Sequence, residues 1–170
     1  LSHHGSFLGT PLAEHEALID LNVKSLVRLT HLLLPELQKH PRAYILNVAS
    51  LAAFYAMPLK TVYAPSKSFV LNFSLALRDE LRGTSVRVCA LCPGGVATNT
   101  LVRELIAAQG LIGRLSCQQP REAASYAIRC LLHNKAVIIP GVMNKLVRIL
   151  GAVAPRTLVR LVIRSRFGAS

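Results

Sequence analysis

The sequence is short of acidic and aromatic residues. Its 170 residues include 8 Asp and Glu against 20 Lys and Arg, a formal net charge of +12, and Phe and Tyr make up 5% with no Trp. Such a charge excess is compatible with an anionic partner: nucleic acid, an anionic membrane or a phosphorylated ligand. Nucleic acid is disfavoured as that partner, because the basic residues lack interleaved aromatic side chains that could stack on bases.

Long uncharged apolar runs are also missing. No stretch of about 20 apolar residues is free of charge, so we expect no membrane-spanning helix. The first residues, Leu1 to Gly5, lack the basic and then apolar layout of a signal peptide, and the chain does not begin with Met. With 52% hydrophobic residues the chain is too apolar to be disordered. We expect a globular domain, or a fragment of a longer one.

Cysteine is scarce as well. The chain has four cysteines, Cys89, Cys92, Cys117 and Cys130. This number is too small for a disulfide scaffold and predicts a reduced, intracellular, cytoplasmic protein. Cys89 and Cys92 form a CxxC pair, but residues three apart in a strand point to opposite faces. Neither these cysteines nor the six histidines have a ligand spacing, so no metal site is predicted.

Hydrophobic periodicity divides the chain into alternating helices and strands. The predicted elements are helix 11–39, strand 44–49, helix 62–82, strand 86–92, helix 99–108, helix 120–133 and strand 136–139. Thr10 is the expected N-cap of the first helix, Pro35 should bend or end it, and Gly83 should stop the second. The first strand has the composition of one buried on both faces.

This alternation predicts an α/β fold with a parallel sheet, because parallel strands need crossover connections. Ligands of such sheets bind at the carboxyl ends of the strands. Functional residues are therefore expected just after positions 49, 92 and 139.

Three polar residues near the first strand end suit proton transfer to a carbonyl oxygen. Ser50 ends the strand, and Tyr63 and Lys67 are four residues apart, which places them on one helical face. An adjacent ammonium favours the phenolate, so Lys67 would lower the pKa of Tyr63 from its usual value of about 10. Ser50 would hold the substrate oxygen while Tyr63 gives or takes its proton. Asn22 lies in the apolar stripe of the first helix, where a polar side chain needs partners.

These residues belong to longer motifs that resemble the short-chain dehydrogenase/reductase family. The motifs are Asn47-Val-Ala-Ser50, Tyr63-Ala-Pro-Ser-Lys67 and Cys92-Pro-Gly-Gly-Val-Ala-Thr98, preceded by an Asn-Val pair in the first helix. The resemblance extends from Leu1 to about residue 141. It implies a Rossmann-like doubly wound parallel sheet and NAD(P)-dependent hydride transfer between the cofactor and an alcohol or carbonyl.

The resemblance also assigns roles. It makes Tyr63 the catalytic acid and base, Lys67 the residue that lowers the pKa of Tyr63 and binds the nicotinamide ribose, and Ser50 the residue that orients the substrate. Asn22 would hold a water that relays protons towards Lys67. The segment expected at the nicotinamide and phosphates includes Pro93, Gly94, Val96 and Thr98. The tail and the Phe-Val pair after Lys67 look more like the branch that acts on lipid-like or steroid-like carbonyls.

The glycine-rich turn that seats the dinucleotide pyrophosphate is not in this sequence. The chain therefore resembles the C-terminal portion of the enzyme, an incomplete sheet with the last three strands and their helices. We expect the strand at 43–49 to have an open edge, neighbouring helices to expose apolar faces, and the chain to be marginally stable, dimeric or aggregation-prone. We expect no measurable NAD(P) binding by the 170 residues alone. NAD cannot be distinguished from NADP.

The tail forms a second unit, residues 142–170, after the motif-bearing unit 1–141. Between Val142 and Phe167 apolar residues interleave with basic ones, without any acid, which predicts two basic amphipathic helices around Pro155. They could contact an anionic membrane peripherally, cover a substrate pocket, or pack on the domain with a solvated basic face. The alternative to the enzyme is thus a truncated, inactive product serving as an interaction or membrane-surface module.

Overall fold

The computed structural model describes residues 5–96 and 117–167. Its elements are α1 (Leu12–Ile19), a π-helical turn η1 (Asp20–Lys24), α2 (Ser25–Leu37), β1 (Ala43–Val48), a 3-10 turn η2 (Leu51–Phe54), α3 (Tyr63–Glu80), β2 (Val86–Leu91), α6 (Pro120–Leu132), β3 (Val137–Ile138), α7 (Val142–Val153) and α8 (Arg156–Phe167). The helix predicted over 99–108 lies outside the described residues.

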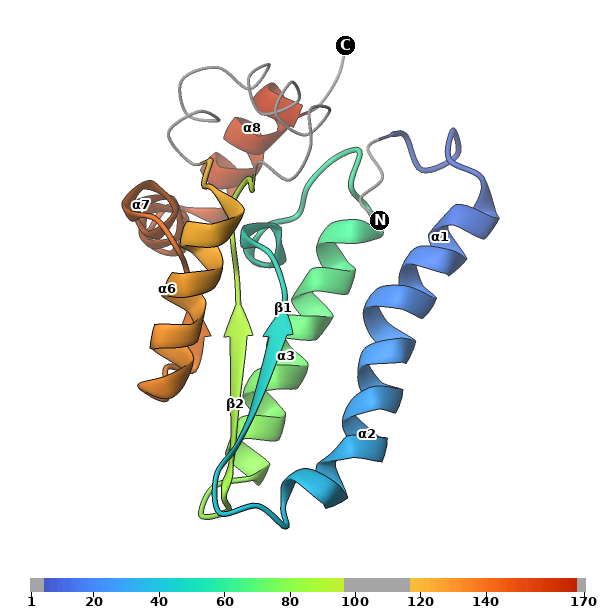
Figure 1. Cartoon of the computed structure of the whole chain (residues 1–170). Coiled ribbons are helices and arrows are strands. Elements are labelled where there is room, and N and C mark those ends of the chain that lie inside the picture. The colour runs from blue at the N-terminus through green and yellow to red at the C-terminus, as the bar shows by residue number, and fades with distance from the viewer. Residues whose placement is uncertain (1–4, 97–116, 168–170) are drawn as a thin grey trace.

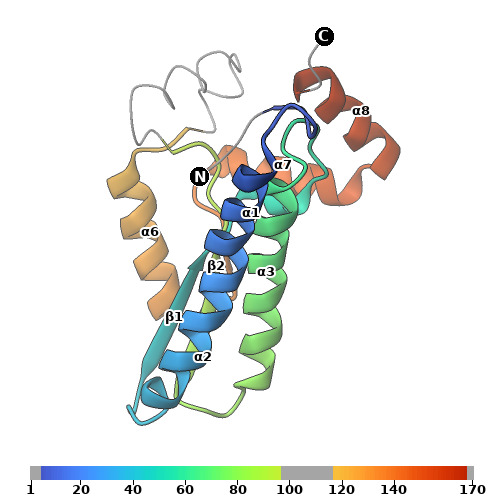
Figure 2. The same cartoon turned by 90° about the vertical axis from the view of Figure 1, so that its right-hand side faces the viewer.

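The strands form a parallel sheet in the order β1-β2-β3, which confirms the predicted α/β fold. β1 pairs with β2 along its whole length, from Ala43 opposite Val86 to Val48 opposite Leu91. β3 is short and pairs with β2 only at its end. Helices α1, α2 and α3 lie on one side of the sheet and α6 on the other (Figures 1 and 2). Strand and helix patterns alternate in the sequence because parallel neighbours need crossover connections: α3 lies between β1 and β2, and α6 lies between β2 and β3.

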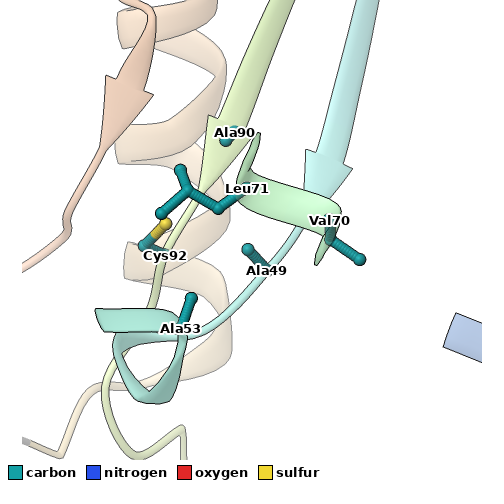
Figure 3. Packing of buried hydrophobic residues seen from close by; sticks show 6 residues of the cluster. All are labelled: Ala49, Ala53, Val70, Leu71, Ala90 and Cys92. Atoms are coloured by element: carbon teal, nitrogen blue, oxygen red, sulfur yellow. The ribbon is translucent and has the colours of Figure 1, made fainter. Parts of the chain in front are cut away.

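β2 is the central strand, and its side chains alternate between buried clusters on the two faces of the sheet. Ala90 and Cys92 pack with Leu71 of α3, whereas Cys89 packs with Ala127 of α6. Cys89 and Cys92 therefore lie on opposite faces, and all four cysteines are free. Figure 3 shows the first cluster closing around the end of β1, where Ala49 and Ala53 flank the segment that carries Ser50. The core thereby fixes the strand end at which the site is expected.

The prediction that the first strand is buried on both faces is wrong. Ala43 and Asn47, which point to one face of the sheet, are buried, whereas Val48, which points to the other, is 55% exposed. In the described part of the chain, β1 also has a hydrogen-bonded neighbour on one side only. The open edge predicted from the sequence is therefore present. Large apolar residues are also exposed on α2 and the turn before it, among them Leu21, Leu29 and Leu32.

The first predicted helix is observed with two differences. Pro11, not Thr10, occupies the N-cap position, and the Thr10 hydroxyl donates instead to the Ser6 carbonyl at 3.2 Å. The helix also contains the π-helical turn η1, in which the backbone N–H of Ser25 donates to the carbonyl of Asp20. Pro35 lies within α2, which ends two residues later. A π-helical turn cannot be recognised from spacing alone, since it shifts the hydrogen-bond pattern by one residue.

The C-terminal part contains the two predicted helices, α7 and α8, on either side of Pro155. Both lie at the end of the molecule towards which β1 and β2 point (Figures 1 and 2). Gly83 ends the second helix region with a φ of +84°, which favours glycine. Among the described residues, no helix is long and apolar enough to cross a membrane.

Candidate active site

The candidate site lies where β1 and β2 end. The backbone N–H of Ala49 donates to the carbonyl of Leu91, and that of Leu51 donates to the carbonyl of Pro93, each at 2.8 Å. These bonds extend the pairing of the strands beyond their last ladder residues. The segments that follow β1 and β2 are therefore held side by side.

Ser50 lies between the end of β1 and the turn η2. Its backbone is extended and its Oγ accepts a hydrogen bond from the backbone N–H of Ala52 at 3.1 Å, so it caps the turn. A hydroxyl that accepts one bond can still donate its proton. Ser50 is thus fixed in place while it retains a donor for a substrate oxygen.

Tyr63 and Lys67 occupy the start of α3, one helical turn apart, as their spacing predicts. The Lys67 Nζ lies 5.9 Å from the centre of the Tyr63 ring and donates a hydrogen bond of 3.0 Å to the Val48 carbonyl. Lys67 therefore joins the start of α3 to the end of β1, two residues before Ser50. Burial lowers the pKa of Lys67, because desolvation disfavours the charged form.

A second lysine beside the phenol was not predicted from the sequence. The Lys60 Nζ lies 5.7 Å from the centre of the Tyr63 ring, and burial lowers the pKa of Lys60 too. The available signal was its position three residues before Tyr63, but no helical spacing applies to a residue in the preceding loop. Tyr63 thus has two amino groups near its ring, a setting suited to negative charge developing on a nearby oxygen.

Asn22 lies in the π-helical turn and contacts α3. Its Nδ2 donates to the Ser66 Oγ at 3.0 Å, and the Ser66 hydroxyl donates to the Tyr63 carbonyl at 2.8 Å. The apolar stripe of the first helix includes an asparagine because that side chain ties the helix to the turn carrying Tyr63 and Lys67. Its partner is Ser66, inside the motif between those two residues.

The segment after β2 has a glycine that its surroundings require. A Cβ at Gly94 would lie 2.5 Å from the Asn144 Oδ1, and Asn144 is fully buried at the start of α7. Val96 forms an isolated parallel bridge with Gln118. Pro93, Gly94 and Val96 therefore belong to a fixed loop at the strand ends, whereas Thr98 lies outside the described residues.

A buried thiol and a cavity lie near the candidate site, but neither contributes to proton transfer at Tyr63. Cys92 is fully buried beneath the strand ends, and burial raises its pKa to about 12, which disfavours the thiolate needed for nucleophilic attack. A cavity of about 630 Å³ beside α3 is lined by residues such as Phe54, Tyr55 and Phe69. Neither Tyr63 nor Lys67 lines it, so this cavity does not place a substrate at the phenol.

A family model described as short chain dehydrogenase matches residues 1–108. The ketoacyl reductase HetN of Nostoc sp. is 28% identical over 165 residues, which cover 93% of this chain and 56% of that protein. The 17-beta-hydroxysteroid dehydrogenase type 3 of Homo sapiens is 37% identical over 92 residues, 54% of this chain and 29% of that protein. The chain thus spans about half the length, or less, of these curated relatives.

Among solved structures, a short chain dehydrogenase from Burkholderia cenocepacia in complex with NADP is similar in fold. The TM-score is 0.77 at 20% sequence identity, and the match covers 99% of this chain and 67% of that one. At this identity the likeness shows the fold. The three-stranded sheet of β1, β2 and β3 therefore has the arrangement found in the Rossmann-like fold of that dehydrogenase.

Proposed function

Because the chain belongs to the short-chain dehydrogenase family, we propose that it carries the catalytic residues of an NAD(P)-dependent oxidoreductase acting on an alcohol or carbonyl. The observation that carries this proposal is the cluster at the strand ends. Lys67 contacts both the Tyr63 ring and the end of β1, with Ser50 two residues beyond the contact. The Lys67 ammonium thus links the Tyr63 ring to the carboxyl end of β1, the kind of position at which parallel sheets bind ligands.

In the proposed reaction, the Ser50 hydroxyl donates a hydrogen bond to the substrate oxygen and orients it. Tyr63 donates its phenolic proton to that oxygen in reduction and accepts a proton in oxidation. Lys67, whose ammonium is held by the Val48 carbonyl, stabilises the phenolate form of Tyr63. The nicotinamide group, when bound, supplies or accepts a hydride at the substrate carbon.

Asn22 has a positioning role in this proposal. Its bond to Ser66, which in turn bonds to the Tyr63 carbonyl, fixes the first turn of α3. Asn22 is also proposed to hold a water that relays protons towards Lys67. The amide oxygen suits that purpose, since the bond to Ser66 uses the amide nitrogen.

The donor set fits the nicotinamide end of NAD or NADP. The Lys67 ammonium and the Tyr63 hydroxyl are the groups that would bind ribose hydroxyls, at the carboxyl end of β1 to which Lys67 is bonded. Pro93, Gly94 and Val96 would lie against the nicotinamide, in a loop whose backbone is fixed by contact with Asn144. Thr98 completes the proposed set. The NADP in the Burkholderia structure belongs to that protein and supports the cofactor class only.

For the substrate, we propose a lipid-like or steroid-like alcohol or ketone. The names of the ketoacyl reductase and of the 17-beta-hydroxysteroid dehydrogenase support this class. An intracellular, cytoplasmic location is part of the proposal, and the four free cysteines are consistent with it. Self-association is also proposed, because exposed apolar side chains on α2, such as Leu32, would be covered by a second copy.

The test is hydride transfer by the product of the full reading frame that contains these residues. We expect NAD(P)H-linked turnover of a panel of fatty and steroid ketones, and a loss of about 10²–10⁴-fold in the Tyr63→Phe variant. Tyr126→Phe, which changes a tyrosine on α6, should leave the rate unchanged. Equal rates in the Tyr63→Phe variant and the wild type would refute the catalytic assignment.

A second function is supported by the C-terminal helices. We propose residues 142–170 as a separate functional unit beside residues 1–141, one that would act as an interaction or membrane-surface module even in a product without catalysis. The supporting observation is that α7 and α8 expose many large apolar side chains. A reading frame that holds a stop codon shortly before the codon for Leu1 would favour this function. One that encodes a glycine-rich turn in frame would favour the enzyme.

A further inference from the structure

Helix α7 is docked with its apolar stripe facing solvent. The stripe recurs at helical spacing and every member is exposed: Val142, Leu146, Ile149, Leu150 and Val153. Val153 is 81% exposed, whereas Asn144 on the same helix is completely buried. Surface helices of globular proteins ordinarily bury the apolar stripe and expose the polar one. The orientation of α7 is the reverse.

Specific contacts on the inner side hold α7 in this rotation. The Asn144 side chain packs on Gly94 and donates to the Pro140 carbonyl at 2.8 Å. The Tyr55 hydroxyl donates to the Val147 carbonyl at 2.8 Å, and a Cβ on Gly151 would lie 2.5 Å from the same Tyr55 oxygen. Turning the helix to bury its apolar stripe would break these contacts. The contacts of α7 with the rest of the fold therefore keep its apolar stripe exposed.

The helix that follows adds positive charge. Arg156, Arg160 and Arg164 of α8 are exposed, and residues 142–167 contain no acid. The salt bridges found among the described residues all lie between residues 20 and 82. Arg160 and Arg164 line a groove of about 620 Å³ together with Met57 and Pro58. Cationic groups thus adjoin apolar surface on α8, the helix that follows the exposed stripe of α7.

The positive charge of α8 favours one kind of binding partner for the surface formed by α7 and α8 over another. A second copy of the chain docking through the same face would bring two sets of arginines together, and like charges repel. An anionic lipid bilayer offers acyl chains to the apolar stripe and phosphates to the arginines, which is how basic amphipathic helices bind at a membrane interface. We propose that α7 and α8 form a docking surface for anionic lipid membranes. This inference rests on the second function proposed above, names its ligand, and does not depend on oxidoreductase activity.

Vesicle flotation of the full chain tests the proposal. We expect binding to vesicles of phosphatidylcholine with phosphatidylserine, little binding to phosphatidylcholine alone, and weakening as salt is added. The double variant Arg160→Gln, Arg164→Gln should bind about 30-fold more weakly, at roughly tenfold per 1.4 kcal/mol and about 1 kcal/mol for each basic residue. Val153→Asp should lose about tenfold or more, and since Val153 is exposed this change leaves the core intact.

Matched controls separate the surface from general charge and hydrophobicity. Arg28→Gln with Arg42→Gln removes the same charge from other exposed positions, and Leu132→Asp changes an exposed leucine on α6. These controls should bind as the wild type does, and far-UV circular dichroism should show that each variant is folded. Binding that ignores lipid charge, equal losses in the controls, or self-association through α7 in place of vesicle binding would each overturn the proposal.

Discussion

Replacing Gly94 by alanine should destabilise the chain by about 2 kcal/mol, because overpacking against a buried side chain costs about 1–3 kcal/mol and losing a buried hydrogen bond costs about 1 kcal/mol. The new β-carbon would lie 2.5 Å from the Oδ1 and 2.7 Å from the Nδ2 of Asn144, closer than non-bonded atoms approach. Asn144 cannot move away freely, because it is fully buried and donates to the Pro140 carbonyl.

A double-mutant cycle isolates the contact. Asn144→Ala alone removes the bond to Pro140 and leaves a small cavity, at a cost of about 1–3 kcal/mol. In the double variant the methyl group added at position 94 occupies part of the space that Asn144 vacates. The two changes together should therefore cost at least about 1 kcal/mol less than the sum of the single changes, because residues in contact are coupled.

Urea unfolding followed by circular dichroism measures the free energies. Gly83→Ala provides the matched control: its backbone φ is +84° and no atom of the described residues lies within 4 Å of the added Cβ, so its effect should be backbone strain alone and additive with Asn144→Ala. A neutral Gly94→Ala, or a cycle without coupling, would show that the loop after β2 does not pack on α7. The fixed backbone proposed for the nicotinamide site would then lose its support.

Three further predictions follow from the site and its surroundings. Burial lowers the pKa of Lys67 in the folded chain below the value of about 10.4 that it has in the unfolded chain. Between those two pKa values the unfolded chain binds more protons, so the free energy of unfolding should rise with pH. Lys67→Met should reduce that rise, as measured by urea unfolding at several pH values. Cys92, fully buried with a pKa of about 12, should be alkylated by iodoacetamide far more slowly than Cys117 and Cys130, and equal labelling by mass spectrometry would contradict its burial. Tyr55→Phe, which removes the 2.8 Å hydrogen bond to α7, should cost about 1 kcal/mol in thermal or urea unfolding, and no loss would mean that this bond does not hold the helix.

Hydrophobic period predicted the parallel α/β fold, because strands that alternate with helices need crossover connections. Motif spacing predicted that Tyr63 and Lys67 share one helical face, because that depends only on the local geometry of the helix. Contacts between distant segments could not be predicted. The bond from Asn22 to Ser66 joins residues 44 positions apart, and it arises from how the first helix crosses α3. The position of Lys60 beside the phenol depends on the path of a loop. The burial of the first strand was misjudged because composition does not report what packs on each of its two faces.

The C-terminal helices show why an amphipathic pattern fixes a helix but not its rotation. The spacing of apolar residues predicted α7, and the usual expectation turns that stripe inward. The rotation of α7 about its axis is determined by two contacts that the hydrophobic period cannot predict. These are the contact of Asn144 with Gly94 and the contact of Gly151 with Tyr55. Each pair places a glycine where a side chain from the other segment needs room. Glycine at those two positions thus determines both the backbone at the candidate cofactor site and which face of α7 meets solvent, so a change at Gly94 or Gly151 should affect the site and the exposed surface together.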